Sequence, residues 1–139
     1  MDLIKRPRRL RINENMRRLV RETSVSVDDF IYPLFVVEGK GIKSEIPSMP
    51  GVYHFSIDLL LKELEEIRDL RIPGVLLFGV PDTKDEKGSG AYNPDGIIQK
   101  ALREIKKEFP EILAVADVCL CEYTSHGHCG LICDGDVEN

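Results

Sequence analysis

The sequence predicts an α/β fold in which parallel strands alternate with helices. Three apolar runs have the length and composition of buried strands, at residues 30–37, 75–80 and 112–118. Two segments with apolar residues at helical spacing separate these runs, and short turns or loops join each element to the next. This order implies parallel strands with right-handed crossovers. It fits both a doubly wound sheet and a (β/α)₈ barrel, and a complete barrel takes about 200 residues or more.

The composition is that of a globular domain. With 139 residues, 42% of them hydrophobic and 31% charged, the chain is long enough to bury a core. None of its apolar runs approaches the roughly 20 residues needed to cross a bilayer, and the first residues lack the apolar segment of a secretory signal. We therefore expect a cytoplasmic protein without a membrane partner.

The first 24 residues read as a basic arm, distinct from the domain at 25–139. Residues 1–21 hold eight Lys or Arg against two acidic residues, whereas the rest of the chain is acidic. Pro7 favours extended backbone at Arg6, and Asn13 can cap a short helix through Arg21. Such an arm binds nucleic acid, contacts another subunit or stays solvated. No aromatic residue interleaves with the arginines, so we favour the last two and expect no nucleic-acid partner.

The first half of the domain should contain one strand and one helix. The apolar run Phe30–Val37 is typical of a strand covered on both faces, and the Gly- and Pro-rich stretch at 39–51 predicts a loop that can include a small hairpin. Ser56 is the expected N-cap of a helix that stops at the Pro73-Gly74 pair. The apolar stripe of this helix is Leu60, Leu64, Ile67 and Leu70 or Arg71.

The second half should contain two strands and a helix. A strand at 75–80 leads into a polar loop at 81–92, whose Gly88-Ser89-Gly90 is a weak phosphate-loop signal that we interpret as a mobile loop. Asn93 as N-cap and Pro94 at the first helical position predict the next helix, which ends before Pro110. Its apolar stripe is Ile97, Ile98, Ala101, Leu102 and Ile105. The strand at 112–118 follows.

All four cysteines of the chain lie between residues 119 and 133. Without a secretory signal, we expect free thiols available for metal or catalysis. Side chains alternate along a strand, so Asp117, Cys119 and Cys121 would share one side while the strand stays extended. Cys129 returns to them after a seven-residue loop in which Gly127 permits a tight reversal.

Three thiolates can converge on one ion. Structural zinc takes four protein ligands, whereas C-x-C followed by one distant cysteine supplies three and leaves a position open for substrate or water. We therefore predict a reactive Zn²⁺ site made by Cys119, Cys121 and Cys129, with Asp117 beside it to steer a proton or hold a substrate amine. Asp117 can equally cap the following turn. Cys133 can complete a closed four-sulfur site, although C-x₃-C fits no common zinc knuckle, and His126 and His128 either bind metal or orient the loop.

The segment from Asp117 to Gly130 resembles the metal-site segment of the porphobilinogen synthase family, also called 5-aminolaevulinate dehydratases. The resemblance extends over nearly the whole chain, through Arg8–Arg11, Tyr32–Val36, Ile46–Val52 and Phe78–Pro81. It implies the first three βα units of a (β/α)₈ barrel, preceded by an arm that wraps a neighbouring subunit, commonly in a homo-octamer. It also implies condensation of two 5-aminolaevulinate molecules to porphobilinogen, with loss of two waters, in haem and tetrapyrrole biosynthesis.

In zinc-using members of this family, the cysteines that match Cys119, Cys121 and Cys129 bind the catalytic metal, and the aspartate that matches Asp117 lies in the active site. The family holds both substrates as Schiff bases on two lysines of later strands, which need a desolvated setting. Here every lysine lies in the arm, a loop or a charged helix face. We therefore expect a truncated member, inactive alone. A zinc-dependent binding module with a closed four-cysteine site is the alternative.

Overall fold

The computed structural model describes residues 8–138, so the start of the arm, including the extended backbone expected at Arg6 and Pro7, lies outside the described residues, as does residue 139. The helices are α1 (Glu14–Leu19), α2 (Ile57–Asp69) and α3 (Ile97–Glu108), with short 3₁₀ turns at Arg9–Arg11, Val27–Asp29 and Ser89–Ala91. The strands are β1 (Ile31–Val37), β2 (Lys43–Glu45), β3 (Tyr53–Ser56), β4 (Gly74–Val80), β5 (Leu113–Ala116), β6 (Leu131–Cys133) and β7 (Asp136–Glu138).

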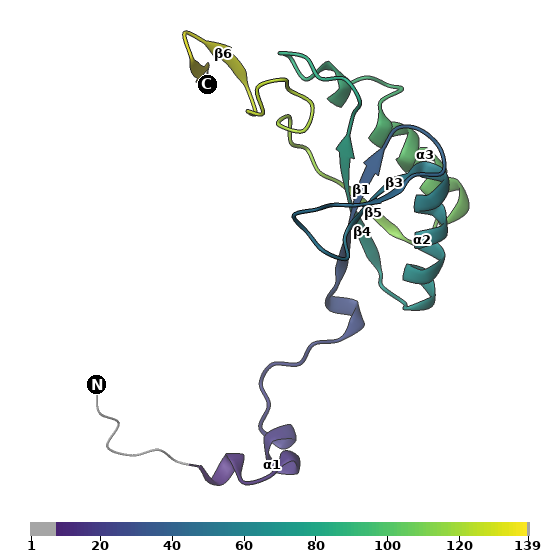
Figure 1. Cartoon of the computed structure of the whole chain (residues 1–139). Helices are drawn as coiled ribbons and strands as arrows, with labels where there is room; N and C mark the ends of the chain where they lie inside the picture. Colours follow the sequence, from purple (N-terminus) through teal and green to yellow (C-terminus); the bar gives the residue numbers. More distant parts are fainter. Residues whose placement is uncertain (1–7, 139) are drawn as a thin grey trace.

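The main sheet has the strand order β2-β3-β1-β4-β5. Strands β1, β4 and β5 are parallel neighbours in chain order, and the connections between them run through α2 and α3. Figure 1 shows both helices on the same side of this sheet. A doubly wound sheet carries helices on both faces, whereas consecutive units of a (β/α)₈ barrel place every helix outside. The arrangement therefore confirms the predicted α/β class and matches the start of a barrel.

The core lies between the sheet and the two helices. In β1 and β4, alternate side chains such as Leu34, Val36 and Leu77 are buried on the helix side. The predicted stripe of α2 faces them except at its last position, and so does most of the stripe of α3. Each such fully buried aliphatic side chain contributes about 1.5–3 kcal/mol relative to exposure. The helix residues buried in this core are Leu60, Leu64, Ile67, Ile97, Ile98, Ala101 and Ile105.

The opposite face of the sheet is less covered by the described residues. Phe35 and Phe78 stack there with ring centroids 5.1 Å apart, and Leu113 is 61% exposed. At the start of β1, Ile31 is also exposed on this face. The prediction that β1 is covered on both faces is therefore wrong for residues 8–138, because only one layer of helices packs on this sheet.

Both main helices differ from the prediction at one end. Helix α2 begins after Ser56 as predicted but ends at Asp69, because Arg71 turns into the left-handed region with φ 60°, and Leu70 is exposed. Helix α3 begins at Ile97, so the predicted start at Asn93 is wrong. The Asn93 side chain accepts from the Asp95 amide and its carbonyl from the Gly96 amide, which closes a separate turn before the helix.

Two strand predictions also need correction. Strand β5 ends at Ala116, two residues early: the Asp117 amide still donates to Leu77 O, but Val118 is 97% exposed. The hairpin expected within residues 39–51 forms instead between β2 and β3, beyond that range, and β3 additionally pairs parallel with the end of β1. The sequence prediction missed β3 because its residues run directly into α2.

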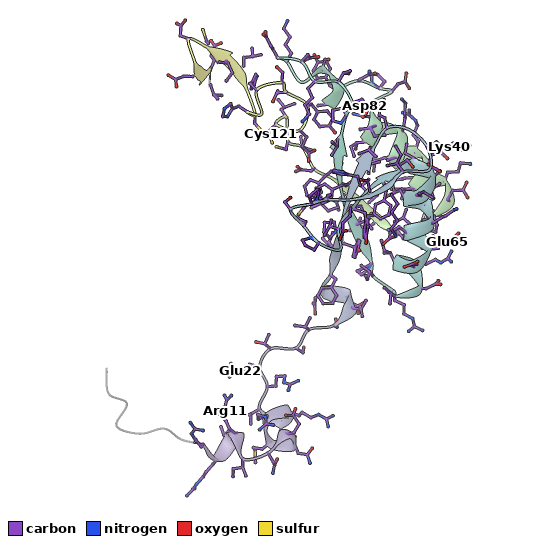
Figure 2. The ribbon with its side chains drawn as sticks, in the orientation of Figure 1. Arg11, Glu22, Lys40, Glu65, Asp82 and Cys121 are labelled. Atoms are coloured by element: carbon purple, nitrogen blue, oxygen red, sulfur yellow. The ribbon has the colours of Figure 1, made fainter. Side chains whose placement is uncertain are left out.

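The described part of the arm extends away from the sheet (Figure 1), and Arg11 and Glu22 lie well apart from it in Figure 2. Asn13 caps α1 as predicted, with its side chain accepting from the Met16 amide at 2.9 Å, but this helix stops at Leu19. Within residues 8–138, none of the helices is long and apolar enough to cross a lipid bilayer.

Candidate metal centre

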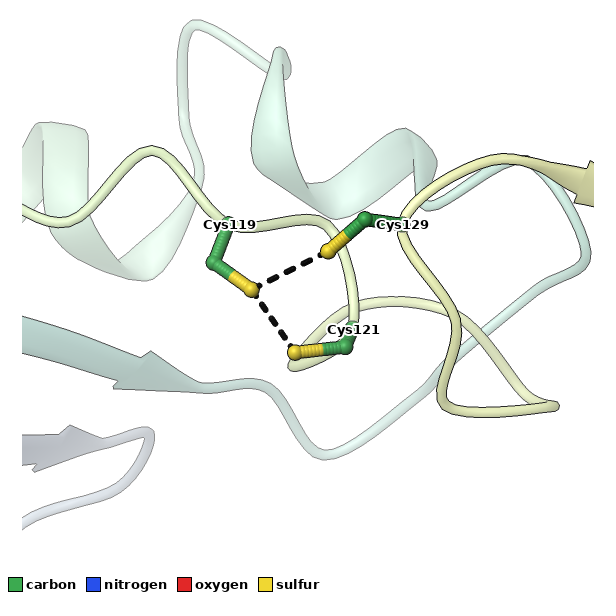
Figure 3. Close-up of side chains that lie close together, drawn as sticks. All are labelled: Cys119, Cys121 and Cys129. Atoms are coloured by element: carbon green, nitrogen blue, oxygen red, sulfur yellow. Dashed lines mark hydrogen bonds between the residues drawn. The ribbon is translucent and has the colours of Figure 1, made fainter. Parts of the chain in front are cut away.

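The three predicted metal ligands meet just beyond the carboxyl end of β5. The Cys119 sulfur lies 2.7 Å from that of Cys121 and 3.2 Å from that of Cys129 (Figure 3). All three sulfurs lie within 4.8 Å of one another. Among the described residues, these three cysteines form the group of His, Cys, Asp or Glu side chains that lie close enough to hold one metal ion. The convergence of the three sulfurs was predicted, but the backbone that produces it was not. Cys119 and Cys121 lie on an irregular turn and not on a continued strand.

A tight turn brings Cys121 back toward Cys119. The amides of Tyr123 and Thr124 both donate to Leu120 O at 2.9 Å, which closes one turn of chain that contains Cys121 and begins directly after Cys119. Tyr123 is buried and its hydroxyl lies against Gly79 of β4, where any larger residue would meet it. Because Gly79 has no side chain, the turn at residues 120–124 can pack against the end of β4 through Tyr123.

A second reversal returns Cys129 to the other two. Gly127 adopts φ 76° at its tip, as the sequence predicted, and the Gly127 amide donates to Thr124 O at 3.4 Å. The hydroxyl of buried Thr124 donates to His128 O at 3.0 Å. Thr124 therefore holds the loop closed immediately before Cys129.

The two histidines of this loop stack on each other, with ring centroids 5.9 Å apart. His126 Nδ1 accepts from the His128 amide, so in the neutral ring the proton lies on Nε2, which then donates to Glu86 O at 3.2 Å. Among the described residues, neither ring belongs to the close group of ligand atoms. His126 thus orients the loop by hydrogen bonds.

Cys133 lies apart from the three sulfurs. It is exposed at the end of β6, which pairs with β7 in a separate two-stranded sheet. Within residues 8–138, the group of side chains close enough to share an ion does not include Cys133. The geometry therefore offers three thiols to an ion and not four.

Two of the three thiols, and the neighbouring Glu122, have shifted pKa values. Hydrogen bonds to Cys121 and Cys129 raise the pKa of Cys119 to about 12, whereas the bond to Cys119 lowers the pKa of Cys129. Burial, reinforced by the charge of Asp117, raises the pKa of Glu122. Asp117 itself lines a cavity of about 180 Å³ together with Cys119 and Tyr123. Asp117 and Cys119 therefore border one small space, which α3 residues such as Ile98 also line.

The donor set fits a soft ion. Three thiolates suit zinc, and hard ions such as Mg²⁺ prefer oxygen ligands. Sulfurs bound tetrahedrally at about 2.3 Å from zinc lie about 3.8 Å apart, so an ion would spread the present cluster slightly. Such a site would leave one coordination position for a small molecule.

Comparison with known proteins gives one consistent result. A family model described as delta-aminolevulinic acid dehydratase matches residues 4–139. The chain is 55% identical over 137 residues to the delta-aminolevulinic acid dehydratase of Ruminiclostridium josui, which covers 99% of this chain. It is 56% identical over 138 residues to that of Helicobacter pylori, again over 99% of the chain, and 54% identical over 134 residues, 96% of the chain, to that of Bacillus subtilis.

The chain spans 67% of the length of the Ruminiclostridium josui relative, but 43% of the Helicobacter pylori protein and 41% of the Bacillus subtilis protein. A solved structure from Toxoplasma gondii, of delta-aminolevulinic acid dehydratase (porphobilinogen synthase) in complex with the reaction product porphobilinogen, matches with a TM-score of 0.91 and 40% sequence identity. That match covers 99% of this chain and 40% of the other. With its fold, its thiol cluster and its sequence in agreement, the chain belongs to the delta-aminolevulinic acid dehydratase family.

Proposed function

We propose that this chain is the metal-binding part of a porphobilinogen synthase, which condenses two molecules of 5-aminolaevulinate to porphobilinogen with loss of two waters. Family membership supports the reaction, and the cluster of Cys119, Cys121 and Cys129 at the carboxyl edge of the sheet supports the metal requirement. Active sites of (β/α)₈ barrels lie at this edge. The thiol cluster is the single observation that carries the proposal for this chain.

The ligands of the proposed site are Cys119, Cys121 and Cys129, and the proposed metal is Zn²⁺. When bound there, zinc would polarise a substrate carbonyl or lower the pKa of a bound water. Asp117 would hold a substrate amine or accept a proton, because it lies two residues before Cys119 and lines a small cavity with it. Tyr123, whose pKa burial raises to about 12, would stay protonated beneath the turn and keep it packed on β4.

The two covalent anchors of the reaction are expected outside residues 1–139. A Schiff-base lysine must be neutral near pH 7, and desolvation is what lowers its pKa. Lys43 and Lys107 show the opposite tendency, since hydrogen bonds to Glu63 and Glu108 raise their pKa values. The remaining lysines that the structure describes are also surface residues, at Lys40, Lys62, Lys84, Lys87, Lys100 and Lys106.

The arm is proposed to contact another copy of the protein in a homo-octamer. Its described part exposes apolar side chains that no core of its own buries, including Leu10 at 58%, Ile12 at 71% and Leu19 at 81%. Exposed apolar residues on an extended arm are suited to packing on a second subunit. The same proposal places the protein in the cytoplasm, where reducing conditions keep the thiols free.

The alternative function, a binding module with a closed four-cysteine site, needs Cys133 as the fourth ligand. Cys133 lies outside the close group of ligand atoms within the described residues, so the geometry favours the open site and the enzyme.

The test uses the complete gene product. Incubation with zinc and 5-aminolaevulinate should yield porphobilinogen, removal of zinc by a chelator should abolish the product, and added zinc should restore it. Cys129→Ser should lose zinc and activity together. Asp117→Asn should keep zinc but lower kcat by about 10²-fold or more, the range typical of a positioned acid or base. A product yield that is unaffected by the chelator would overturn the zinc assignment.

A further inference from the structure

A turn built around Asp85 lies beside the cysteine loop. The Asp85 carboxylate accepts from the Lys87 amide at 2.8 Å and from the Ser89 amide at 3.1 Å, and it also accepts from the Ser89 hydroxyl. These bonds lower the pKa of Asp85, so the carboxylate is ionised at neutral pH. Bonds to a charged acceptor are the stronger kind, which makes this carboxylate the organising group of residues 85–89.

The backbone of Asp85 is in turn bonded to the cysteine loop. The Asp85 amide donates to Tyr123 O at 3.3 Å, and the Ser125 amide donates to Asp85 O at 2.9 Å. Together these bonds form a short parallel bridge between Asp85 and Thr124. The next carbonyl, that of Glu86, lies 3.2 Å from His126 Nε2. The turn therefore holds the middle of the loop that separates Cys121 from Cys129.

One further contact reaches the third ligand. Thr124, at the centre of the bridge and 2% exposed, donates its hydroxyl to the carbonyl of His128. Cys129 is the next residue, and it is exposed, ten positions from Cys119. Its place in the cluster thus depends on the loop and not on burial of its own side chain.

We infer that Asp85 is a positioning residue of the metal centre, which holds Cys129 in place through the 85–89 turn and the bridge to Thr124. This inference rests on the zinc assignment of the proposed function. Asp85 acts through the loop, which it fixes before the ion binds, so that less ordering accompanies binding. Loss of groups that orient metal ligands typically weakens metal affinity by 10–100-fold.

The experiment compares Asp85→Ala, Asp85→Asn and Asp82→Ala in the complete gene product. Asp82 is an exposed carboxylate on the same loop, at the same end of the molecule as Cys121 (Figure 2), and serves as the matched control. Zinc affinity is measured by chelator competition, and Co²⁺ replaces zinc to report thiolate ligation through its charge-transfer absorption. Asp85→Ala should weaken zinc by about 10–100-fold and reduce the thiolate–cobalt absorption by about a third, as expected if one of three thiolates is lost.

Asp85→Asn retains an acceptor oxygen for the Lys87 and Ser89 amides, so its zinc affinity should return to within about threefold of the wild type, since a neutral acceptor keeps the bonds but weakens them. If Asp85→Ala does not fold, Ser89→Ala removes one bond to the same carboxylate and should weaken zinc by a smaller, still measurable factor. Zinc affinity and cobalt absorption in Asp85→Ala that equal those of Asp82→Ala would overturn the inference and leave the proposed function standing. A wild type that binds zinc but forms no porphobilinogen would instead refute the proposed function alone.

Discussion

Two sulfurs of the candidate metal centre differ in how readily each loses its proton. Cys129 has a lowered pKa and forms a thiolate more readily than Cys119, whose pKa is about 12 and which keeps its proton at neutral pH until an ion displaces it. The shared hydrogen bonds of the cluster produce this order. Metal binding must therefore release at least the Cys119 proton.

The affinity of the cluster for zinc should rise with pH. Protons compete with the ion for the same sulfurs, so each proton released makes the affinity about tenfold higher per pH unit, and the affinity falls as pH drops. Chelator competition between pH 6 and pH 8 measures this slope. Cys133→Ser, at an exposed sulfur outside the cluster, should leave both slope and affinity unchanged. A zinc affinity independent of pH would mean that the thiols are not the ligands.

Gly79→Ala should destabilise the protein by about 1–3 kcal/mol, the usual cost of overpacking. A methyl group at this position would meet the Tyr123 hydroxyl and would lie 2.6 Å from Ile98 Cγ1. Chemical denaturation measures the loss. Tyr123→Phe removes the clashing oxygen, so the double variant should be more stable than the two single effects predict, because the two residues are in contact. Strict additivity would show that Tyr123 does not rest on Gly79.

At the scale of helices and strands, the local sequence pattern predicted which elements form better than where they end. Apolar periodicity predicted β1, β4, α2 and α3, because their buried stripes are set by the spacing of residues along the chain. Their ends were less predictable. Asn93 is a residue type that often caps helices, yet its side chain closes a separate turn before α3 begins. The sequence does not show which of these two hydrogen-bonding roles an Asn side chain will take.

The convergence of the three thiols was predicted from the sequence, and the residues that support them were missed. The spacing of Cys119, Cys121 and Cys129 identified the cluster, but the extended alternation that was expected to align them stops at Ala116. The role of Asp85 could not be predicted, because the bonds that it makes with Tyr123 and Ser125 join residues nearly 40 positions apart. Its one local signal was an Asp followed by Gly88-Ser89, a common turn composition.

Asp58 should stabilise the junction between the β2–β3 hairpin and α2. Its carboxylate accepts from the Gly41 amide at 3.0 Å and from the Ser56 hydroxyl at 2.6 Å, and the Ser56 bond is the main cause of its lowered pKa. A lowered pKa contributes stability above the unfolded value near pH 4, which is lost as pH falls through the folded value. Asp58→Asn should therefore lower Tm by a few degrees at pH 7.

The effect of Asp58→Asn should shrink below about pH 4, where the wild-type carboxylate is itself protonated. Thermal unfolding followed at several pH values measures this convergence. Asp69→Asn, at an exposed carboxylate at the other end of α2, is the control and should change Tm little at any pH. A Tm difference for Asp58→Asn that persists at low pH would contradict the ionic origin.

On the scale of the whole molecule, the face of the main sheet opposite α2 and α3 is not covered by a second layer within the described residues. Both helices pack on the same side, and the Phe35–Phe78 stack lies on the other, where a closed barrel would have its interior. Strand β5 is the last strand of the main sheet and lacks a partner on its outer edge within the described residues. Unpaired edges and uncovered apolar faces favour association of chains.

Residues 1–139 expressed alone should bind zinc through the thiol cluster but fold only partly or aggregate, and should form no porphobilinogen. No described lysine has the desolvated setting of a Schiff-base anchor, and positioning of two substrates can supply about 7–11 kcal/mol of the barrier reduction. Incubation with zinc and 5-aminolaevulinate, followed by borohydride trapping, tests this. Zinc-dependent product or a trapped lysine adduct would show that the anchors lie within these residues.

Removal of residues 1–24 from the complete gene product should dissociate the assembly without removing zinc. The arm carries exposed apolar side chains and makes its described contacts chiefly within itself, as in the pairs of Glu14 with Arg17 and Arg21. Sedimentation measures the oligomer, and metal analysis measures the zinc. An oligomer of unchanged size would contradict a subunit contact through the arm.

The bridge between Asp85 and Thr124 also affects when the thiol cluster can form during protein synthesis. Each contact described above that places the three sulfurs comes from a residue between Gly79 and Cys129. A ribosome delivers the chain from its amino end, and segments that are complete can fold while later ones are still being made. Once Cys129 has emerged, every part of the thiol cluster and its support is present, so a nascent chain could capture its metal ion well before the barrel closes around it.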